Sequence, residues 1–280
     1  MSLLLAVVAG VVHAFLIAYQ KVPAFIVTLG GLMAYRGVLI GMTKGRSITP
    51  MRPSFLFLGQ SYLPTIVGFV IALVAIALFL LFVLNRRRSR RKLKLQAEPL
   101  AMSVVRVVVF AAVISGFTLV LNSYRGIPVP VVIMLSVVLV LTFVSNRTRF
   151  GRRLYAIGGN LEAAQYSGIN IDRTIAVVFV INAVLSGIAG LVLTARLDSG
   201  TVGAGTMAEL DVIAAAVIGG ASLAGGIGTV PGAIIGALIM ASLDNGMSLL
   251  NTEAYWQYIV RGIILVLAVW FDVKSSKKSV

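Results

Sequence analysis

The sequence predicts an all-α fold, a polytopic bundle of transmembrane helices formed by residues 1–280 as a single domain. Three observations predict it: 59% of residues are hydrophobic and only 12% charged, long apolar runs recur, and basic residues gather in a few stretches between those runs. A water-soluble domain has roughly half apolar and a quarter charged residues. A soluble fold of this length could not cover so much apolar surface.

Nine membrane segments are predicted, and most are about long enough to cross ~30 Å of hydrocarbon as a helix. In chain order they are Leu3–Tyr19, Ala24–Met42, Pro64–Leu84, Ala101–Leu121, Val129–Val144, Thr174–Thr194, Ala208–Leu223, Val230–Leu243 and Tyr255–Phe271. The seventh and eighth are short and Gly-rich, so we expect them to be partial or re-entrant.

The basic residues predict which side each loop faces. Seven Lys and Arg lie in Arg86–Lys94, five in Arg147–Arg173 and three in Lys274–Lys278. Cytoplasmic loops carry such an excess, so a basic loop at 85–98, the segment 146–173 and the C-terminus are expected in the cytoplasm. Although the net charge is +15, this distribution argues against a nucleic-acid partner.

This topology also gives an expectation about the start of the chain. Nine spans with a cytoplasmic C-terminus place Met1 outside, and barely two residues precede the first apolar run. The basic stretch that opens a signal peptide is missing. We therefore expect a chain that is truncated at its N-terminus, with further helices upstream.

The chain offers no constellation for catalysis, cofactor or metal binding. It has no cysteine and a single histidine, His13 in an apolar run, for which helix packing is a better interpretation than a proton relay. The phosphate-binding pattern G-x-x-x-x-G-K-[ST] does not occur. The Gly-rich run Gly219–Gly228 predicts a tight hairpin between the seventh and eighth segments instead. The sequence therefore indicates a protein that is not an enzyme.

The few charges near or within the spans leave alternatives open. Arg36 and Arg261 lie inside predicted spans, where either snorkelling to an interface or a pathway or packing role would explain them. Small residues at Gly37–Gly41 and Gly232–Gly236 have the spacing of close helix packing, which is also common by chance in membrane helices. Five acidic residues cluster near the predicted outer face and suit loop capping or an external partner: Asp198, Glu209, Asp211, Asp244 and Glu253.

The most informative stretch is the polar island at residues 149–173, RFGRRLYAIGGNLEAAQYSGINIDR. Gly158 and Gly159 are predicted to break the chain, and Asn160 then stands as the N-cap of a short helix, with Glu162 near the positive end of that helix. Gly168 supplies the left-handed residue that often ends a helix. A short helix joined to two spans at the membrane face is suited to receive a push from a neighbouring subunit.

At these residues the chain resembles the permease subunits of bacterial sugar ABC importers, in the ribose/xylose/arabinose branch. The resemblance rests on KVPAFIVTLGGLMAYRG, FGRRLYAIGGNLEAAQYSGIN, AELDVIAAAVIGGASLAGGIGTVPGAIIGALIMASLDNGM and WQYIVRGIILVLAVW, which together cover nearly all of the chain. The family's usual Ile-Asp-Leu-Ser-Val-Gly stretch does not occur here, which agrees with a truncated start.

The resemblance implies an ATP-driven pentose importer, with xylose as the favoured sugar, in the bacterial inner membrane. It implies four partners: a second permease copy, cytosolic ATP-binding subunits, a periplasmic sugar-binding protein and the lipid membrane. It also implies that the cytosolic segment docks on the ATP-binding subunit through Gly151, Arg152, Arg153, Gly158, Gly159, Asn160, Glu162, Ala163, Ala164 and Gly168. A secondary transporter driven by an ion gradient is the alternative, although no acidic residue lies deep in a clearly predicted span.

Overall fold

The computed structural model describes residues 1–92 and 100–276. It divides into two compact units, one made of residues 1–51 and 134–280 and the other of residues 52–133. Both units are helical, and within the described ranges the only strand-like pairings are two isolated bridges, Ile48 with Gly200 and Tyr62 with Pro128. The all-α prediction is confirmed.

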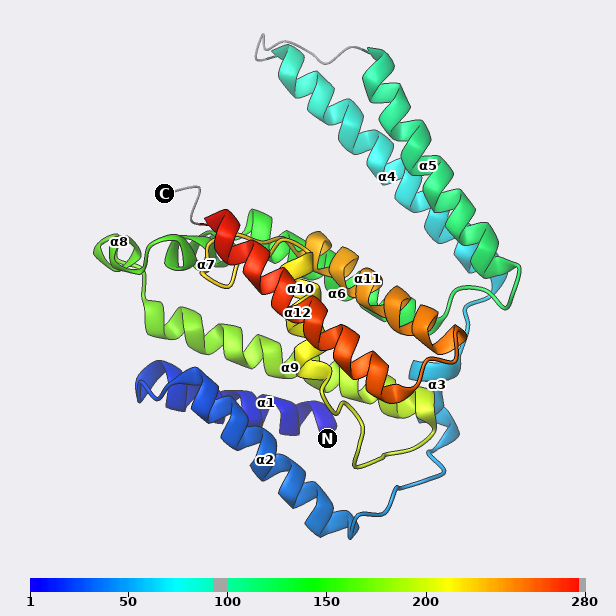
Figure 1. Ribbon diagram of the computed structural model, residues 1–280. Coiled ribbons are helices and arrows are strands. Elements are labelled where there is room, and N and C mark those ends of the chain that lie inside the picture. Colours follow the sequence, from blue (N-terminus) through cyan, green and yellow to red (C-terminus); the bar gives the residue numbers. More distant parts are fainter. Residues whose placement is uncertain (93–99, 277–280) are drawn as a thin grey trace. The chain divides into compact units, whose positions relative to one another are not determined.

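The larger unit holds most of the helices (Figure 1). They are α1 (Ser2–Ala14), which continues as a π-helical turn (Phe15–Tyr19), α2 (Ala24–Thr43), α6 (Val129–Arg147, whose first residues belong to the smaller unit), α7 (Arg149–Gly159), α8 (Leu161–Tyr166), α9 (Ile171–Leu197), α10 (Ala208–Ile218), α11 (Val230–Leu249) and α12 (Ala254–Ser276). The smaller unit holds α3 (Pro53–Gln60), α4 (Thr65–Lys92) and α5 (Leu100–Asn122).

Eight helices in the described part of the chain are long and apolar enough to cross a membrane. The predicted segment at Ala208–Leu223 is the exception: its helix α10 has 11 residues and ends at Ile218, as expected for a partial span. The prediction that Val230–Leu243 is short was wrong, because α11 runs for 20 residues to Leu249. It continues past Asp244 because the charge of that side chain is met by an arginine on the next helix.

In the larger unit α1 lies along α9, and both helices carry glycine where they meet (Figure 1). A Cβ built on Gly10 would stand 2.7 Å from the Cβ of Ala183, and one on Gly187 would stand 2.7 Å from the Cβ of Ala6. Small residues therefore let these two helices approach closely, as is usual in membrane bundles. Beyond the end of the π-helical turn, Lys21 forms an ion pair with Asp172 at the start of α9.

Helices α10 and α11 also approach each other closely in this unit. A Cβ on Gly236 would overlap the carbonyl oxygen of Ala215, and one on Gly232 would overlap that of Gly219. Ala214, Ala215 and Met240 form a buried core cluster at this contact. The Gly232–Gly236 spacing is thus used for packing. The other predicted spacing, at Gly37–Gly41, is not used in this way. A Cβ built on either glycine would meet no neighbouring helix or side chain within 4 Å.

Within the smaller unit, α4 and α5 lie side by side as a helical hairpin (Figure 1). Phe79 and Phe110 stack across it with ring centroids 4.1 Å apart, and the amide of Asn122 donates to the carbonyl of Thr65 at 3.3 Å. The predicted basic loop at 85–98 is corrected in part, since α4 stays helical to Lys92. Residues 93–98 of that loop, with Lys277 and Lys278 of the tail, lie outside the described residues.

Candidate functional site

The polar island folds into α7 and α8, and α7 begins with a sharp turn out of α6. The hydroxyl of Thr148 accepts from the amide of Gly151 at 3.3 Å and donates to the carbonyl of Val144 at 2.6 Å. Gly151 is buried, and a Cβ there would overlap the carbonyl oxygen of Ser145. Glycine is needed at this position because the backbone of α6 occupies the space that a side chain would take.

Asn160 caps α8 as predicted. Its side-chain oxygen accepts from the amide of Ala163 at 2.9 Å, and Glu162 lies in the first turn. Both features stabilise the start of a short helix. The predicted break at Gly158 and Gly159 was wrong by one residue, since α7 includes both glycines and the chain leaves the helix at Asn160, with φ −155° and ψ 109°.

Gly168 ends α8 in the left-handed conformation, with φ +75°, which confirms the prediction. The amide of Gly168 donates to the carbonyl of Gln165 at 3.0 Å, and the amide of Ile169 donates to that of Ala164 at 3.2 Å. This pair of bonds is the Schellman arrangement that satisfies the last carbonyls of a helix. A helix of only six residues is therefore held at both ends.

The C-terminal half of α7 lies on the Gly-rich run Gly219–Gly228. A Cβ on Gly158 would overlap the backbone nitrogen of Gly226, and a Cβ on Gly225 would lie 2.8 Å from the carbonyl oxygen of Gly158. The hydroxyl of Tyr155 donates to the carbonyl of Gly228 at 2.8 Å. The run is the predicted tight hairpin, with positive φ at four glycines, and its turn is the surface that receives α7.

The hairpin is held from its other side by Asp272 near the end of α12. One carboxylate oxygen of Asp272 accepts from the amide of Leu223 at 2.9 Å and from the hydroxyl of Ser222 at 3.3 Å. Within the hairpin, the amide of Ser222 donates to the carbonyl of Ile227 at 3.0 Å. Asp272 had no predicted role. An acidic residue just before the basic tail was the available signal.

The ten residues predicted for docking divide into two groups. Gly151, Gly158 and Ala164 are buried or half-buried and serve packing within the chain, whereas the others are exposed: Arg152, Arg153, Gly159, Asn160, Glu162, Ala163 and Gly168. Two exposed apolar residues accompany this second group, with Tyr166 90% exposed and Leu161 52% exposed. The exposed face of α7 and α8 therefore combines two guanidinium groups, a carboxylate and an aromatic ring.

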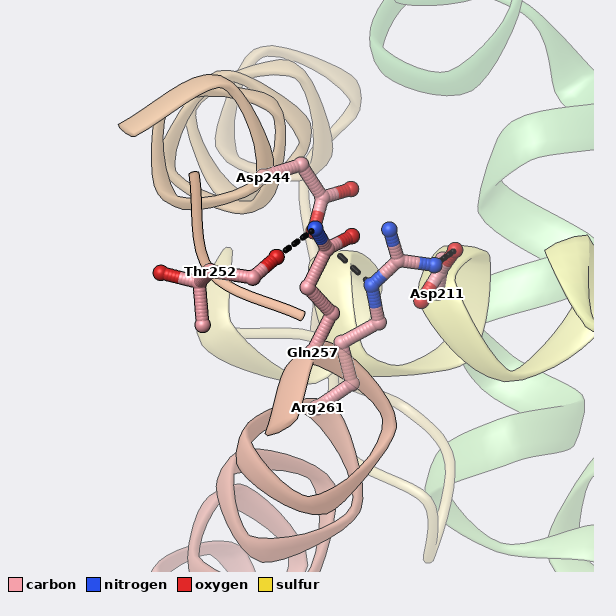
Figure 2. Close-up of polar contacts among 5 residues, drawn as sticks. All are labelled: Asp211, Asp244, Thr252, Gln257 and Arg261. Atoms are coloured by element: carbon pink, nitrogen blue, oxygen red, sulfur yellow. Dashed lines mark hydrogen bonds and ion pairs between the residues drawn. The ribbon is translucent and has the colours of Figure 1, made fainter. Parts of the chain in front are cut away.

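A second polar cluster joins α10, α11 and α12 (Figure 2). Arg261 donates from Nε to Asp244 at 2.8 Å and from a terminal nitrogen to Asp211 at 3.1 Å. Next to it, the amide of Gln257 donates to the carbonyl of Thr252 at 3.1 Å. Charges inside a membrane bundle are usually paired in this way. Arg261 therefore has a packing role among the three helices, which is one of the roles that the sequence left open.

A cavity of about 230 Å³ borders this cluster between α10 and α12. Asp211 and Arg261 line it, together with Tyr258 and Leu265, and the remaining lining is mainly apolar. Neither this cavity nor the cluster beside it was predicted from the sequence. The available signal was the presence of two carboxylates and one guanidinium in the last three helices, with Asp211 in α10, Asp244 in α11 and Arg261 in α12.

Three further sequence predictions concern single residues. Asp198 was expected to cap a loop or to contact an external partner, and its carboxylate accepts from the amide of Met51 at 2.8 Å within the chain, as loop capping predicts. Arg36 donates to the hydroxyl of Thr206 at 3.2 Å. His13 stacks on Tyr35 with ring centroids 5.6 Å apart, as the packing interpretation predicts.

Among residues 1–92 and 100–276, no group of three or more His, Asp or Glu side chains could hold a metal ion.

Comparison with known proteins identifies the kind of protein that carries these features. The model of the family described as "Branched-chain amino acid transport system / permease component" matches residues 96–269. The xylose transport system permease protein of Haemophilus influenzae is 48% identical over 277 residues, 99% of this chain and 74% of that protein. Its counterpart in Escherichia coli strain K12 is 48% identical over 278 residues, 99% of this chain and 71% of that protein.

More distant relatives match part of the chain. The ribose import permease protein of Bacillus subtilis is 44% identical over 153 residues, 55% of this chain and 48% of that protein. No solved structure matches. The chain therefore belongs to the family of permease components of the branched-chain amino acid transport type, and it is a multi-pass inner-membrane component of a transport system rather than an enzyme.

Proposed function

We propose that this chain is the membrane-spanning permease subunit of an ATP-driven pentose importer, with xylose as the sugar. The observation that carries the proposal is the 48% identity to xylose permeases over 99% of the chain. The eight apolar helices supply a membrane bundle, and the α7–α8 segment supplies a structured face outside it. In this proposal residues 1–280 act as one permease domain.

Membership of the family implies an ATP-binding partner and a substrate-binding partner. We infer that the segment 146–173 docks on the ATP-binding partner through the exposed face of α7 and α8. Arg152, Arg153 and Glu162 offer charges of both signs, and Tyr166 offers a ring that is 90% exposed. Exposed aromatic and arginine side chains are the residues that most often anchor protein interfaces. We further propose that a second copy of this chain completes the membrane part.

The position of the end of α12 supports the proposed sidedness. Asp272 near the end of α12 and Tyr155 of α7 both bond the same hairpin, so the end of α12 and the docking segment lie at one face of the larger unit. Arg147, Arg152 and Lys274 belong to the basic stretches at this face. The positive-inside rule then assigns this face, the basic stretch 85–98 and the C-terminus to the cytoplasm.

The mechanism is a shift between conformations. ATP binding by the partners moves the docked α7–α8 segment, and the bundle changes the side on which it is open. Such a shift needs partners that bind one arrangement more tightly than the other. Because α8 is capped at both ends, it can transmit a displacement as a rigid body instead of absorbing it by fraying.

The test is xylose uptake by proteoliposomes that hold the permease together with its ATP-binding and substrate-binding partners. We expect uptake that requires ATP and continues after an uncoupler collapses the proton gradient. Uptake that follows the gradient without ATP would favour a secondary transporter instead. Ribose and arabinose, each loaded on its own binding protein, are the controls for the sugar.

The docking face has its own test. Glu162→Lys, Gly159→Trp and Tyr166→Ala should each weaken capture of the ATP-binding subunit in detergent and lower uptake in parallel. Tyr166→Phe is the matched control, since it keeps the exposed ring. Unchanged capture and uptake in all three variants would remove the docking proposal while leaving the transport activity intact.

A further inference from the structure

We propose that the Gly219–Gly228 hairpin is the element that receives the coupling motion, and that Tyr155, Gly158 and Asp272 are its positioning residues. This inference rests on the proposed function, because it needs α7 and α8 to be moved by an ATP-binding partner. It adds the route by which that motion enters the bundle. The route runs from α7 through the hairpin to α10, α11 and α12.

The first step is the contact between α7 and the hairpin, which is made by backbone on both sides. A side chain at Gly158 would overlap the nitrogen of Gly226, and a Cβ on Gly226 would lie 2.9 Å from the Cα of Gly159. Since no flexible side chain lies between the two backbones, a displacement of the end of α7 moves the hairpin directly.

The need for close approach also explains why a glycine is present inside a helix. Gly158 lies within α7 and is not among the glycines with positive φ, so its backbone conformation does not require glycine. Glycine inside a helix is less favourable than alanine by about 1 kcal/mol. What requires glycine at this position is the space that Gly226 occupies, which ties the residue to the hairpin.

The second step fixes the hairpin laterally. The hydroxyl of half-buried Tyr155 donates to the carbonyl of Gly228, one residue before Thr229. Thr229 is the N-cap of α11, and its hydroxyl accepts from the amide of Gly232 at 3.1 Å. The bond from Tyr155 therefore reaches the backbone at the start of α11.

The third step carries the motion to three helices. The hairpin joins α10 to α11, and its own turn is closed by the bond from Ser222 to Ile227 and another from the amide of Gly225 to the carbonyl of Ser222 at 3.1 Å. Asp272 adds α12 through Ser222 and Leu223. Because these hydrogen bonds hold the turn in one conformation, a displacement of the turn moves all three helices.

The far ends of the same three helices are joined again by Arg261, Asp211 and Asp244. Along α11, Val230 and Asp244 are separated by roughly 20 Å at the rise of an α-helix. The three helices are therefore connected at two places, by the hairpin with Asp272 at one end and by the Arg261 cluster at the other. We expect α10, α11 and α12 to move together as one rigid group. The cavity of about 230 Å³ beside Arg261 lies at the end of this group of helices that is remote from the hairpin.

The experiment uses the complete transporter in proteoliposomes and measures partner capture, ATP hydrolysis and xylose uptake for each variant. Gly158→Ala, Tyr155→Phe and Asp272→Asn should leave capture and hydrolysis near the parent values. Their uptake per ATP hydrolysed should fall by about twofold to thirtyfold, the range expected when a coupling residue is altered. Asp272→Glu should recover part of the loss because it keeps the acceptor. Gly190→Ala is the control, since its Cβ meets nothing within 4 Å.

A direct readout avoids dependence on variants that fold poorly. The chain has no native cysteine, so Leu223→Cys gives a single labelling site on an exposed side chain, 57% exposed, while the backbone bond to Asp272 remains. A fluorophore at this site should respond to ATP binding by the partner. Tyr155→Phe should weaken that response.

The outcomes separate this inference from the proposed function. Absence of ATP-dependent uptake in the parent protein contradicts the proposed function. Coupled uptake with a probe at position 223 that does not respond to ATP overturns the hairpin route alone. A parallel fall of hydrolysis and uptake in all three variants also overturns it, because that result describes damaged assembly instead of lost coupling.

Discussion

Arg261 of α12 donates from Nε to Asp244 of α11 at 2.8 Å, and this ion pair links the last two helices (Figure 2). The same guanidinium also bonds Asp211 of α10. All three side chains are partly buried, with exposed fractions of 25–31%. One arginine thus compensates two carboxylates on separate helices.

Replacing Arg261 should therefore cost more than replacing either acid. Arg261→Ala leaves two carboxylates without their shared cation, and we expect a loss of about 3 kcal/mol, the lower part of the range for breaking a buried pair. Asp211→Asn and Asp244→Asn each leave Arg261 with one carboxylate and should cost less. Thermal unfolding of the purified permease in detergent measures the ranking.

Gly262→Ala is the control for this series, because a Cβ at the neighbouring position meets nothing within 4 Å. A triple replacement of the cluster by Met and Leu tests what the charges contribute, since hydrophobic replacements of buried ion pairs are often neutral. Equal losses for all three single variants would contradict the role of Arg261 as the shared partner.

Much of this fold could be predicted because long apolar runs leave few alternatives in a membrane. The predicted boundaries of Ala24–Met42 and Ala101–Leu121 lie within one residue of α2 and α5. The end of α11 was missed because Asp244 looked like the end of a span, and its partner is remote in sequence. Apolarity predicts where a helix can cross, but it does not show which charges are neutralised by packing.

The paired glycines of α11 give a matched test of helix packing. A Cβ on Gly236 would overlap the carbonyl oxygen of Ala215, whereas one on Gly246 in the same helix meets nothing within 4 Å. Gly236→Ala should therefore destabilise the protein by about 1–3 kcal/mol through overpacking. Gly246→Ala should be neutral or slightly stabilising, because alanine favours the helix. Urea or thermal unfolding of both variants gives the comparison.

The docking segment was predictable where its signals are local. The cap at Asn160 and the stop at Gly168 depend on residues three to five positions apart, and the structure has both. The reason for Gly158 could not be found in the same way, because it depends on Gly226 in another part of the chain. The formation of α8 could therefore be predicted from the sequence, but the contact of α7 with the Gly219–Gly228 hairpin could not.

The cap of α8 can be tested at Asn160 alone, with the charged and aromatic side chains of the exposed face unchanged. Asn160→Ala removes the acceptor for the amide of Ala163 and should cost about 1 kcal/mol of local stability. Hydrogen exchange of the α8 amides should then become several-fold faster, while exchange in α9 stays unchanged. Asn160→Asp keeps an oxygen acceptor and should retain the protection. Equally fast exchange in both variants would show that the helix is held by something other than its cap.

The ion pair of Lys21 with Asp172 should contribute little, although it joins segments far apart in the sequence. Both side chains are well exposed, at 65% and 40%, and exposed pairs typically contribute between about 0 and 1 kcal/mol. A double-mutant cycle of Lys21→Ala and Asp172→Ala should give a coupling energy within that range, decreasing as salt screens the charges. The double variant should unfold near the parent temperature, since α1 and α9 are held mainly by the close approach at Gly10 and Gly187. A coupling energy several times larger would place the pair, and not the glycine contact, as the main link between these helices.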